Sequence, residues 1–284
     1  MERKEKKTSN SEKKITRLIA LLKKMQNVAI AYSGGVDSSL LLKIAKQTLQ
    51  DKVLAVTVDS PIYPQEELRF ACRMTASWGI KHKIAKIDFL KDPSFVRNSV
   101  NRCYYCKREL FKRLWVIARR FKINFVLDGG NTSDSLDFRP GNRAKREFNI
   151  HSPLEECAIN KQDIYRLSKA LDLPTRNKPT TVCLASRIPY GQPILSKDLK
   201  MIEQAEGYIK RIGFKQVRLR HYNLNGSLKL ARIELDKRDI PYLTGSRRPK
   251  VCSYLKRVGY DYITLDMEGY RPGSLNKFSK PSPD

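Results

Sequence analysis

A glycine-rich segment near the N-terminus has the residue types that bind phosphate. Residues 33–39 read Ser-Gly-Gly-Val-Asp-Ser-Ser and lie between an apolar, β-branched stretch and a helical pattern. Paired glycines allow a tight turn and a close approach of the backbone to a ligand. The helix that follows offers N–H groups to a phosphate, and Asp37 could hold a bridging Mg²⁺. An ordinary turn with a helix cap is the alternative. The predicted nucleotide-binding residues are Ser33, Gly34, Gly35, Asp37, Ser38 and Ser39.

A second glycine pair, Gly129-Gly130, follows a later strand-like stretch. In doubly wound sheets, ligands bind beyond the carboxyl ends of the strands. Gly129 and Asn131 are therefore candidates for the same nucleotide site, and a plain turn is an equal alternative.

Three cysteines form the second chemical candidate. Cys103 and Cys106 make a C-x-x-C pair, and Cys183 lies much later. A zinc site is disfavoured because the sequence offers no second closely spaced pair of ligands. A thioredoxin-like redox pair would need a different fold pattern. Buried structural cysteines remain possible and are the default for Cys72, Cys157 and Cys252. The fourth interpretation is three thiolates that hold a [4Fe–4S] cluster with one open iron.

The elements that must position these residues alternate between strand and helix. Such alternation predicts an α/β fold, a doubly wound parallel sheet with helices on both faces. Polar, irregular stretches follow at 131–161 and beyond 171, and then a smaller α+β pattern. We expect disordered tails at 1–10 and 277–284, a nucleotide-binding domain at 11–185 and a smaller domain with substrate and oligomer contacts at 186–276. The predicted strands span 27–32, 52–59, 81–88, 124–128, 215–222, 227–235 and 261–266, and the helices 11–25, 38–49, 65–78, 106–121, 162–171, 196–212 and 246–258.

The composition bounds the class of protein. The chain has 284 residues and a formal net charge of +27, which favours polyanionic partners such as a nucleotide or tRNA, although a solvated basic surface is the alternative. Hydrophobic residues make up 40%, enough for a core, and no apolar run reaches the roughly 18 residues of a membrane span. The charged N-terminus is followed by no signal-peptide apolar region, so we expect a cytoplasmic protein. Six cysteines are too few for a disulfide scaffold, and a cytoplasmic setting would keep them reduced.

Five segments together carry a family resemblance: AYSGGVDSSLL, RCYYCK, CLASRIPYG, LARIEL and LDMEGYRPGSLN. The chain thereby resembles the LarE family of ATP-dependent sulfur insertases, members of the PP-loop ATP pyrophosphatases, with an adenine nucleotide alpha hydrolase-like fold. The resemblance implies adenylation of pyridinium-3,5-biscarboxylic acid mononucleotide with ATP and Mg²⁺. It also implies replacement of AMP by sulfur, which gives a thiocarboxylate of the nickel-pincer nucleotide cofactor.

The resemblance also assigns residues. Cys183, in CLASR, matches the sulfur-handling cysteine, and together with Asp37 of the glycine-rich loop it makes up the predicted catalytic residues. One branch of the family sacrifices this cysteine. The other adds a C-x-x-C and carries a [4Fe–4S] cluster, and Cys103 and Cys106 place the chain in that branch.

Other positions match family residues that bind substrate. Lys107, Arg218 and Arg220 match positions near the substrate phosphate, and the alternation of the two arginines puts them on one face of a strand. A solvent-facing basic strand is the alternative. Glu206 and Glu234 are weaker candidates for a metal or ligand site, because surface carboxylates are usually solvated. The predicted substrate-binding residues are Lys107, Ser186, Arg187, Arg218, Arg220, Glu206 and Glu234.

The family also implies a sulfide or other sulfur donor and a homo-oligomer. The main rival is a cluster-dependent tRNA thiolase, which the charge of +27 favours. An amidotransferase or synthetase of the GMP or NAD type would need an ammonia source. A nucleotide-binding module without catalytic activity is the remaining class.

Overall fold

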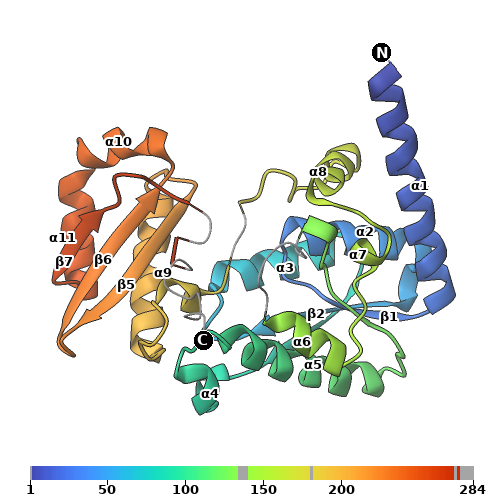
Figure 1. The fold of residues 1–284 in the computed structure, drawn as a ribbon, viewed down its shortest axis with the longest axis horizontal. Coiled ribbons are helices and arrows are strands. Elements are labelled where there is room, and N and C mark those ends of the chain that lie inside the picture. The colour runs from blue at the N-terminus through green and yellow to red at the C-terminus, as the bar shows by residue number, and fades with distance from the viewer. Residues whose placement is uncertain (1, 134–139, 180–181, 272–273, 276–284) are drawn as a thin grey trace, which may run out of the picture. The chain divides into compact units, whose positions relative to one another are not determined.

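A computed structural model describes residues 2–133, 140–179, 182–271 and 274–275. These residues form two compact units (Figure 1). The first comprises residues 1–60, 65–87 and 103–181, and the second comprises 61–64, 88–102 and 182–284. The boundary expected at 185/186 lies close to the division at 181/182, and two short segments from the first half of the chain also belong to the second unit.

Hydrogen bonds explain why these short segments belong to the second unit. The Leu184 N–H donates to the Ile62 carbonyl oxygen at 2.7 Å, and the Asn98 side chain donates to the Pro189 and Gln192 carbonyl oxygens at 2.8 Å. Contacts between residues that lie about 90 or more positions apart leave no local pattern in the sequence.

A four-stranded parallel sheet forms the centre of the first unit. Its strands are β1 (Val28–Ala31), β2 (Val53–Asp59), β3 (Lys81–Lys86) and β4 (Val126–Leu127), in the order β3-β2-β1-β4. The chain moves outward from β1 to β3 and then returns to the other side of β1. This order confirms the predicted doubly wound sheet, and it puts the switch point between β1 and β4.

Helices flank both faces of this sheet, with α2 (Val36–Leu49) and α3 (Gln65–Ser77) opposite α5 (Arg102–Arg120) in Figure 1. The other helices are α1 (Glu2–Met25), α6 (Gly141–Glu147), α7 (Pro153–Glu156) and α8 (Lys161–Ala170). Because α1 begins at Glu2, residues 2–10 of the expected N-terminal tail are helical. The tail expected at 277–284 lies outside the described residues. Both α6 and α7 are too short to show a helical period.

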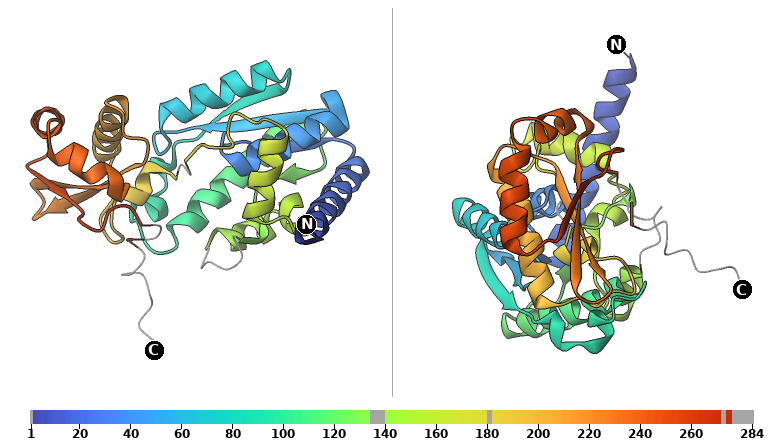
Figure 2. Two further views of the ribbon diagram at one scale, coloured as in Figure 1. Left: turned by 90° about the horizontal axis from the view of Figure 1, so that it is seen from above. Right: turned by 90° about the vertical axis from the view of Figure 1, so that its left-hand side faces the viewer.

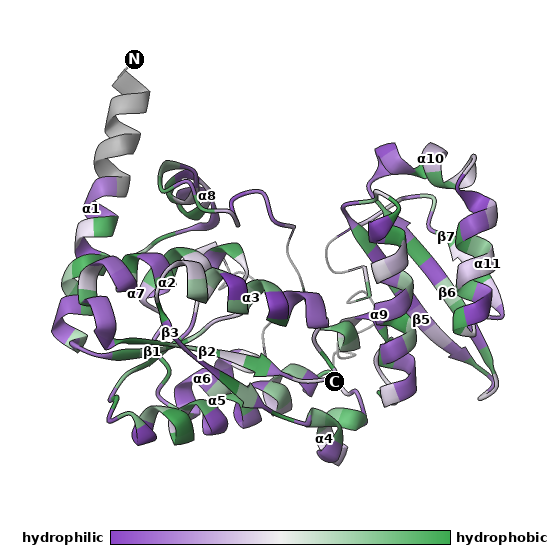
Figure 3. Cartoon of the chain, turned by 180° about the vertical axis from the view of Figure 1, so that it is seen from behind, coloured by the Kyte–Doolittle hydropathy of each residue, from purple (hydrophilic) through white to green (hydrophobic). Residues whose placement is uncertain are grey.

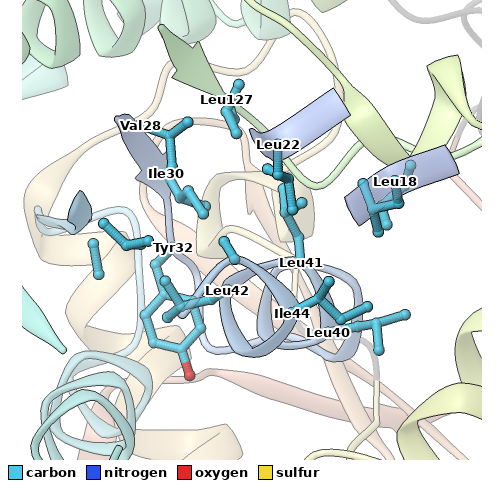
Figure 4. Close-up of a cluster of buried hydrophobic side chains, with 14 of the residues drawn as sticks. Leu18, Leu22, Val28, Ile30, Tyr32, Leu40, Leu41, Leu42, Ile44 and Leu127 are labelled. Carbon is cyan, nitrogen blue, oxygen red and sulfur yellow. The ribbon is translucent and has the colours of Figure 1, made fainter. Parts of the chain in front are cut away.

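The core of the first unit lies between β1, α1 and α2 (Figure 4). Val28 and Ile30 of β1 are buried against Leu18 and Leu22 of α1 and the leucines of α2. The strand β1 is an unbroken apolar run because a central parallel strand is covered on both faces. The edge strand β3 is largely hydrophilic by contrast (Figure 3).

The second unit contains a smaller mixed sheet (Figure 2). Strands β5 (Val217–Leu224) and β6 (Leu228–Leu235) form an antiparallel hairpin, and β7 (Tyr262–Leu265) pairs with β6 in parallel. Helix α9 (Ser196–Arg211) packs against β5, and α11 (Arg248–Val258) packs against α9. Two short helices, α4 (Pro93–Val96) and α10 (Ile240–Thr244), complete the unit. The α+β prediction for this part of the chain is confirmed.

No helix in the described parts of the chain combines the length and the apolar character that crossing a bilayer requires.

Candidate active site

The glycine-rich loop lies where the sequence predicts it, between β1 and the N-terminus of α2. Gly34 has a φ of +71°, a conformation that side chains disfavour, and a Cβ there would lie 3.2 Å from the Phe70 ring. No side chain caps α2 at Gly35. The Ser38 hydroxyl donates to the Gly35 carbonyl oxygen at 3.2 Å and lies 3.1 Å from the Ser33 hydroxyl oxygen. The two serines therefore fix the loop and leave the helix N-terminus for an anion.

Tyr32 and Ser39 support the loop from the interior. Ser39 is fully buried, and its hydroxyl oxygen lies 3.3 Å from the Tyr32 phenol oxygen. Burial raises the pKa of Tyr32 to about 12, so the phenol stays neutral and keeps its hydrogen. The side chain of Ser39 thus faces the core, although the sequence motif suggested a contact to phosphate.

Two lysines that sequence reasoning missed lie beside the loop. The Lys161 ammonium contacts both carboxylate oxygens of Asp37, at 2.6 and 2.7 Å. The Lys178 ammonium donates to the Gly34 carbonyl oxygen at 3.1 Å and to Glu67 at 2.6 Å. Neither lysine belongs to the glycine-rich motif, so only the folded chain could reveal them.

The second glycine turn meets the first at the switch point of the sheet. A Cβ on Gly129 would lie 2.9 Å from the Ser38 backbone nitrogen, so only glycine fits against the start of α2. Asn131 is buried, and its side-chain oxygen accepts from the Ser133 N–H at 3.0 Å. Gly129 therefore packs directly against the glycine-rich loop at the start of α2, and Asn131 stabilises the turn that contains Gly129.

Asp128, between β4 and this turn, is a third residue near the loop that the sequence analysis did not single out. Burial opposes its ionisation, but the positive charges of Lys145 and Lys107 and hydrogen bonds from Ser152 and Gly130 lower its pKa. The Lys145 ammonium lies 3.1 Å from the carboxylate. Lys107, predicted to bind substrate phosphate, thus lies in the first unit among charges that face Asp128.

A buried ion pair organises the CLASR turn of the second unit. Arg187 donates to both carboxylate oxygens of Glu206, at 2.8 and 3.0 Å. It also donates to the Cys183 carbonyl oxygen at 3.1 Å and to the Ser186 hydroxyl oxygen at 2.9 Å. Although burial opposes its charge, Glu206, with smaller contributions from Cys183 and Tyr270, raises the pKa of Arg187. Arg187 therefore holds in place the turn that begins at Cys183.

Arg218 and Arg220 share one face of β5, as predicted, and both are buried, at 4% and 6% exposure. The interpretation as a solvent-facing strand is therefore wrong. Arg220 donates to Glu234 at 2.7 Å and to the Ser186 carbonyl oxygen at 3.1 Å. Burial and the nearby positive charge of Arg187 lower the pKa of Arg218.

Glu206 and Glu234 are buried rather than solvated. Glu206 binds Arg187 and accepts from the Leu219 N–H at 2.9 Å. Glu234 binds Arg220 and, at 3.2 Å, Arg232. Both carboxylates therefore position arginines. The alternative of solvated surface carboxylates is wrong, and a role for either residue at a metal or ligand site stays a prediction.

The cysteines of the motif lie in both units. Helix α5 begins at Arg102, so exposed Cys103 and buried Cys106 are one helical turn apart. Cys183, half-buried, precedes the short helical turn Leu184–Arg187 in the second unit. Thiolates are the usual ligands of an iron–sulfur cluster. Of the three thiols that the resemblance implies, Cys103 and Cys106 belong to the first unit and Cys183 to the second. Among the described residues, no group of three His, Cys, Asp or Glu could hold a metal ion. Of the remaining cysteines, Cys157 is buried, while Cys72 and Cys252 are half-buried.

Comparisons with known proteins agree with this geometry. A PP-loop domain family matches residues 7–100. A pyridinium-3,5-bisthiocarboxylic acid mononucleotide synthase of Lactiplantibacillus plantarum is 35% identical over 91% of this chain and 92% of its own length. An uncharacterised Synechocystis protein is 38% identical over 94% of this chain and 98% of its own. An NH₃-dependent NAD⁺ synthetase of Campylobacter jejuni is 27% identical over 52% of this chain and 60% of its own. The chain therefore belongs to the PP-loop ATP pyrophosphatase superfamily and, within it, to the LarE family of ATP-dependent sulfur insertases.

Proposed function

We propose that this enzyme converts the carboxylates of pyridinium-3,5-biscarboxylic acid mononucleotide to thiocarboxylates at the expense of ATP. A relative named as the synthase of the bisthiocarboxylic product matches this chain over nearly its whole length. The chemistry needs an ATP site, a site for a phosphate-bearing substrate and a means of handling sulfur.

The arginine cluster of the second unit is the observation that carries the proposal. Four arginines gather there around three carboxylates, those of Glu206, Glu234 and, 3.8 Å from Arg232, Asp266. Burial and, after it, the positive charge of Arg187 lower the pKa of Arg218, so a bound dianion would offset the charge that the buried arginines carry. A mononucleotide phosphate is such a dianion. The cluster comprises Arg187, Arg218, Arg220 and Arg232.

The first unit would activate the carboxylate. A substrate carboxylate oxygen attacks the α-phosphorus of ATP, the bond between that phosphorus and the bridging oxygen breaks, and pyrophosphate leaves. The N-terminus of α2 suits the departing pyrophosphate, since its N–H groups and dipole favour an anion. Asp37 would hold Mg²⁺, which offsets the phosphate charge. The product is an acyl-adenylate with AMP as leaving group.

Sulfur then replaces AMP. A sulfide nucleophile attacks the activated carbonyl carbon, the carbon–oxygen bond to AMP breaks, and a thiocarboxylate remains. We infer that the chain belongs to the cluster-bearing branch, in which Cys103, Cys106 and Cys183 would hold a [4Fe–4S] cluster that binds exogenous sulfide. The support is the C-x-x-C on one turn of α5 and the partial exposure of Cys183.

Mass spectrometry of the mononucleotide after incubation with enzyme, ATP, Mg²⁺ and sulfide tests the proposal. We expect oxygen-to-sulfur exchange at both carboxylates and a large loss of product with Arg218→Ala at low substrate concentration. Arg238→Ala is the matched control, because Arg238 is a surface arginine paired with Asp236. Unchanged mononucleotide with ATP-competent wild-type enzyme would refute the assignment of substrate.

A further inference from the structure

The contact between Lys161 and Asp37 occupies the carboxylate that the proposed reaction needs for its metal. The ammonium lies 2.6 and 2.7 Å from the two carboxylate oxygens. Both side chains are 29% exposed, so a ligand can reach the pair from solvent. Mg²⁺ prefers carboxylate oxygens and phosphate oxygens as ligands. An ammonium group that contacts both oxygens of Asp37 therefore competes with the metal for the same atoms.

Neither the dipole nor the cap of α8 calls for a cation at Lys161. It is the first residue of α8, where the positive end of the helix dipole disfavours a cation. The helix already begins with a capping box between Asn160 and Asp163, and Lys14 binds Asp163 at 2.6 Å. The Lys161 backbone N–H donates to the Ser133 hydroxyl oxygen. This bond fixes the Lys161 backbone and leaves its side chain to reach Asp37. The Lys161 ammonium also lies 5.4 Å from the centre of the Tyr165 ring on α8, but its two short contacts are to the Asp37 carboxylate.

We propose that Lys161 neutralises Asp37 when no nucleotide is bound and releases it to Mg²⁺ when ATP binds. An ammonium on a flexible four-carbon stem can exchange a carboxylate partner for a phosphate oxygen. The same group would then stabilise Asp37 in the empty enzyme and bind the triphosphate in the loaded one. This inference rests on the proposed use of ATP, and it makes Lys161 a positioning residue for the metal.

Binding of Mn²⁺, a paramagnetic substitute for Mg²⁺, tests the competition without turnover. Electron paramagnetic resonance titration would compare wild type with Lys161→Met, each in the absence of nucleotide. Lys161→Arg keeps the charge and is expected to retain the weak wild-type affinity. Lys46→Met is the matched control, because Lys46 forms a separate pair with Asp51 at 2.8 Å in the same unit. A double variant, Asp37→Asn with Lys161→Met, shows whether any gained affinity belongs to Asp37.

We expect Lys161→Met to bind Mn²⁺ about fivefold more tightly than wild type, equivalent to about 1 kcal/mol, the upper range for a partly exposed ion pair. The gain should vanish in the double variant and be absent in Lys46→Met. Lys161→Met should also bind a non-hydrolysable ATP analogue with Mg²⁺ at least tenfold more weakly than wild type. The reason is that the charge-assisted hydrogen bond from Lys161 to the triphosphate is lost.

Unchanged Mn²⁺ affinity in a folded Lys161→Met protein would overturn the inference and leave Lys161 as a structural anchor. A gain that survives Asp37→Asn would also overturn it. Failure of the proposed function is distinguishable, because it would appear as wild-type enzyme that binds the ATP analogue but makes no thiocarboxylate.

Discussion

Gly129 offers a sharp test of how the two glycine turns form one nucleotide site. The change is Gly129→Ala, which adds a single methyl group at the switch point of the sheet. The new Cβ would lie 2.9 Å from the Ser38 nitrogen and 3.1 Å from its Cα. Both neighbours are backbone atoms of α2, so neither can rotate out of the way.

The magnitude follows from the geometry. Ordinary contact starts near 3.4 Å, so the turn and the helix must separate by 3.4 − 2.9 = 0.5 Å. Overpacking of this kind costs about 1–3 kcal/mol, whereas replacing glycine stabilises by about 0.4–1 kcal/mol through the unfolded chain. The cost of the clash exceeds the gain, so we expect the free energy of unfolding to fall by roughly 1–2 kcal/mol. Since a misplacement of about 1 Å can cost about a hundredfold in rate, half of that should reduce turnover on the order of tenfold.

Thermal unfolding and ATP-dependent pyrophosphate release measure the two effects on the same samples. Gly207→Ala is the matched control, since its Cβ would meet nothing within 4 Å and it lies inside α9. Gly207→Ala should raise the free energy of unfolding by about 0.5–1 kcal/mol, because alanine favours the helix over glycine. If Gly129→Ala has the unfolding temperature and the turnover rate of wild type, the turn after β4 does not pack against the start of α2, and the reasoning is refuted.

Three further predictions concern ionisation, a buried charge and iron. Folding raises the pKa of Tyr32 to about 12, so the neutral Tyr32 phenol contributes its full stability below pH 10. That contribution is lost as the pH rises from about 10 to 12. Tyr32→Phe should therefore flatten this part of a plot of the free energy of unfolding in urea against pH. Glu206→Gln should destabilise by about 3–5 kcal/mol in urea, since Arg187 loses its buried partner, and a loss under about 1 kcal/mol would contradict that role. Anaerobic protein should contain about four irons per chain, which Cys103→Ala removes and Cys252→Ala does not; active iron-free protein would disprove the cluster.

The sequence predicted the elements with strong periodicity well. The helix expected at 196–212 spans Ser196–Arg211, and the strand expected at 52–59 spans Val53–Asp59. Helix α5 starts earlier than expected because the polar RCYYCK segment has no apolar period. The glycine-rich loop was predictable because tight turns before a helix need specific residues in sequence order.

The partners of the site residues were not predictable. Lys161 reaches Asp37 across 124 positions, and Lys178 reaches Gly34 across 144. Glu206 and Glu234 read as surface carboxylates because nothing in the sequence shows that arginines bury them. Local patterns encode elements and loops, whereas charge pairing across the fold depends on tertiary contacts.

Pyrophosphate release from ATP tests the central claim most directly, with the pyridinium biscarboxylate mononucleotide in one reaction and unmodified tRNA in another. We predict stimulation by the mononucleotide alone, because the arginine cluster, in which three of the four arginines are buried, suits a single phosphate-bearing molecule. Stimulation by tRNA alone would contradict the proposed substrate, and the charge of +27 would then be a sign of nucleic-acid binding.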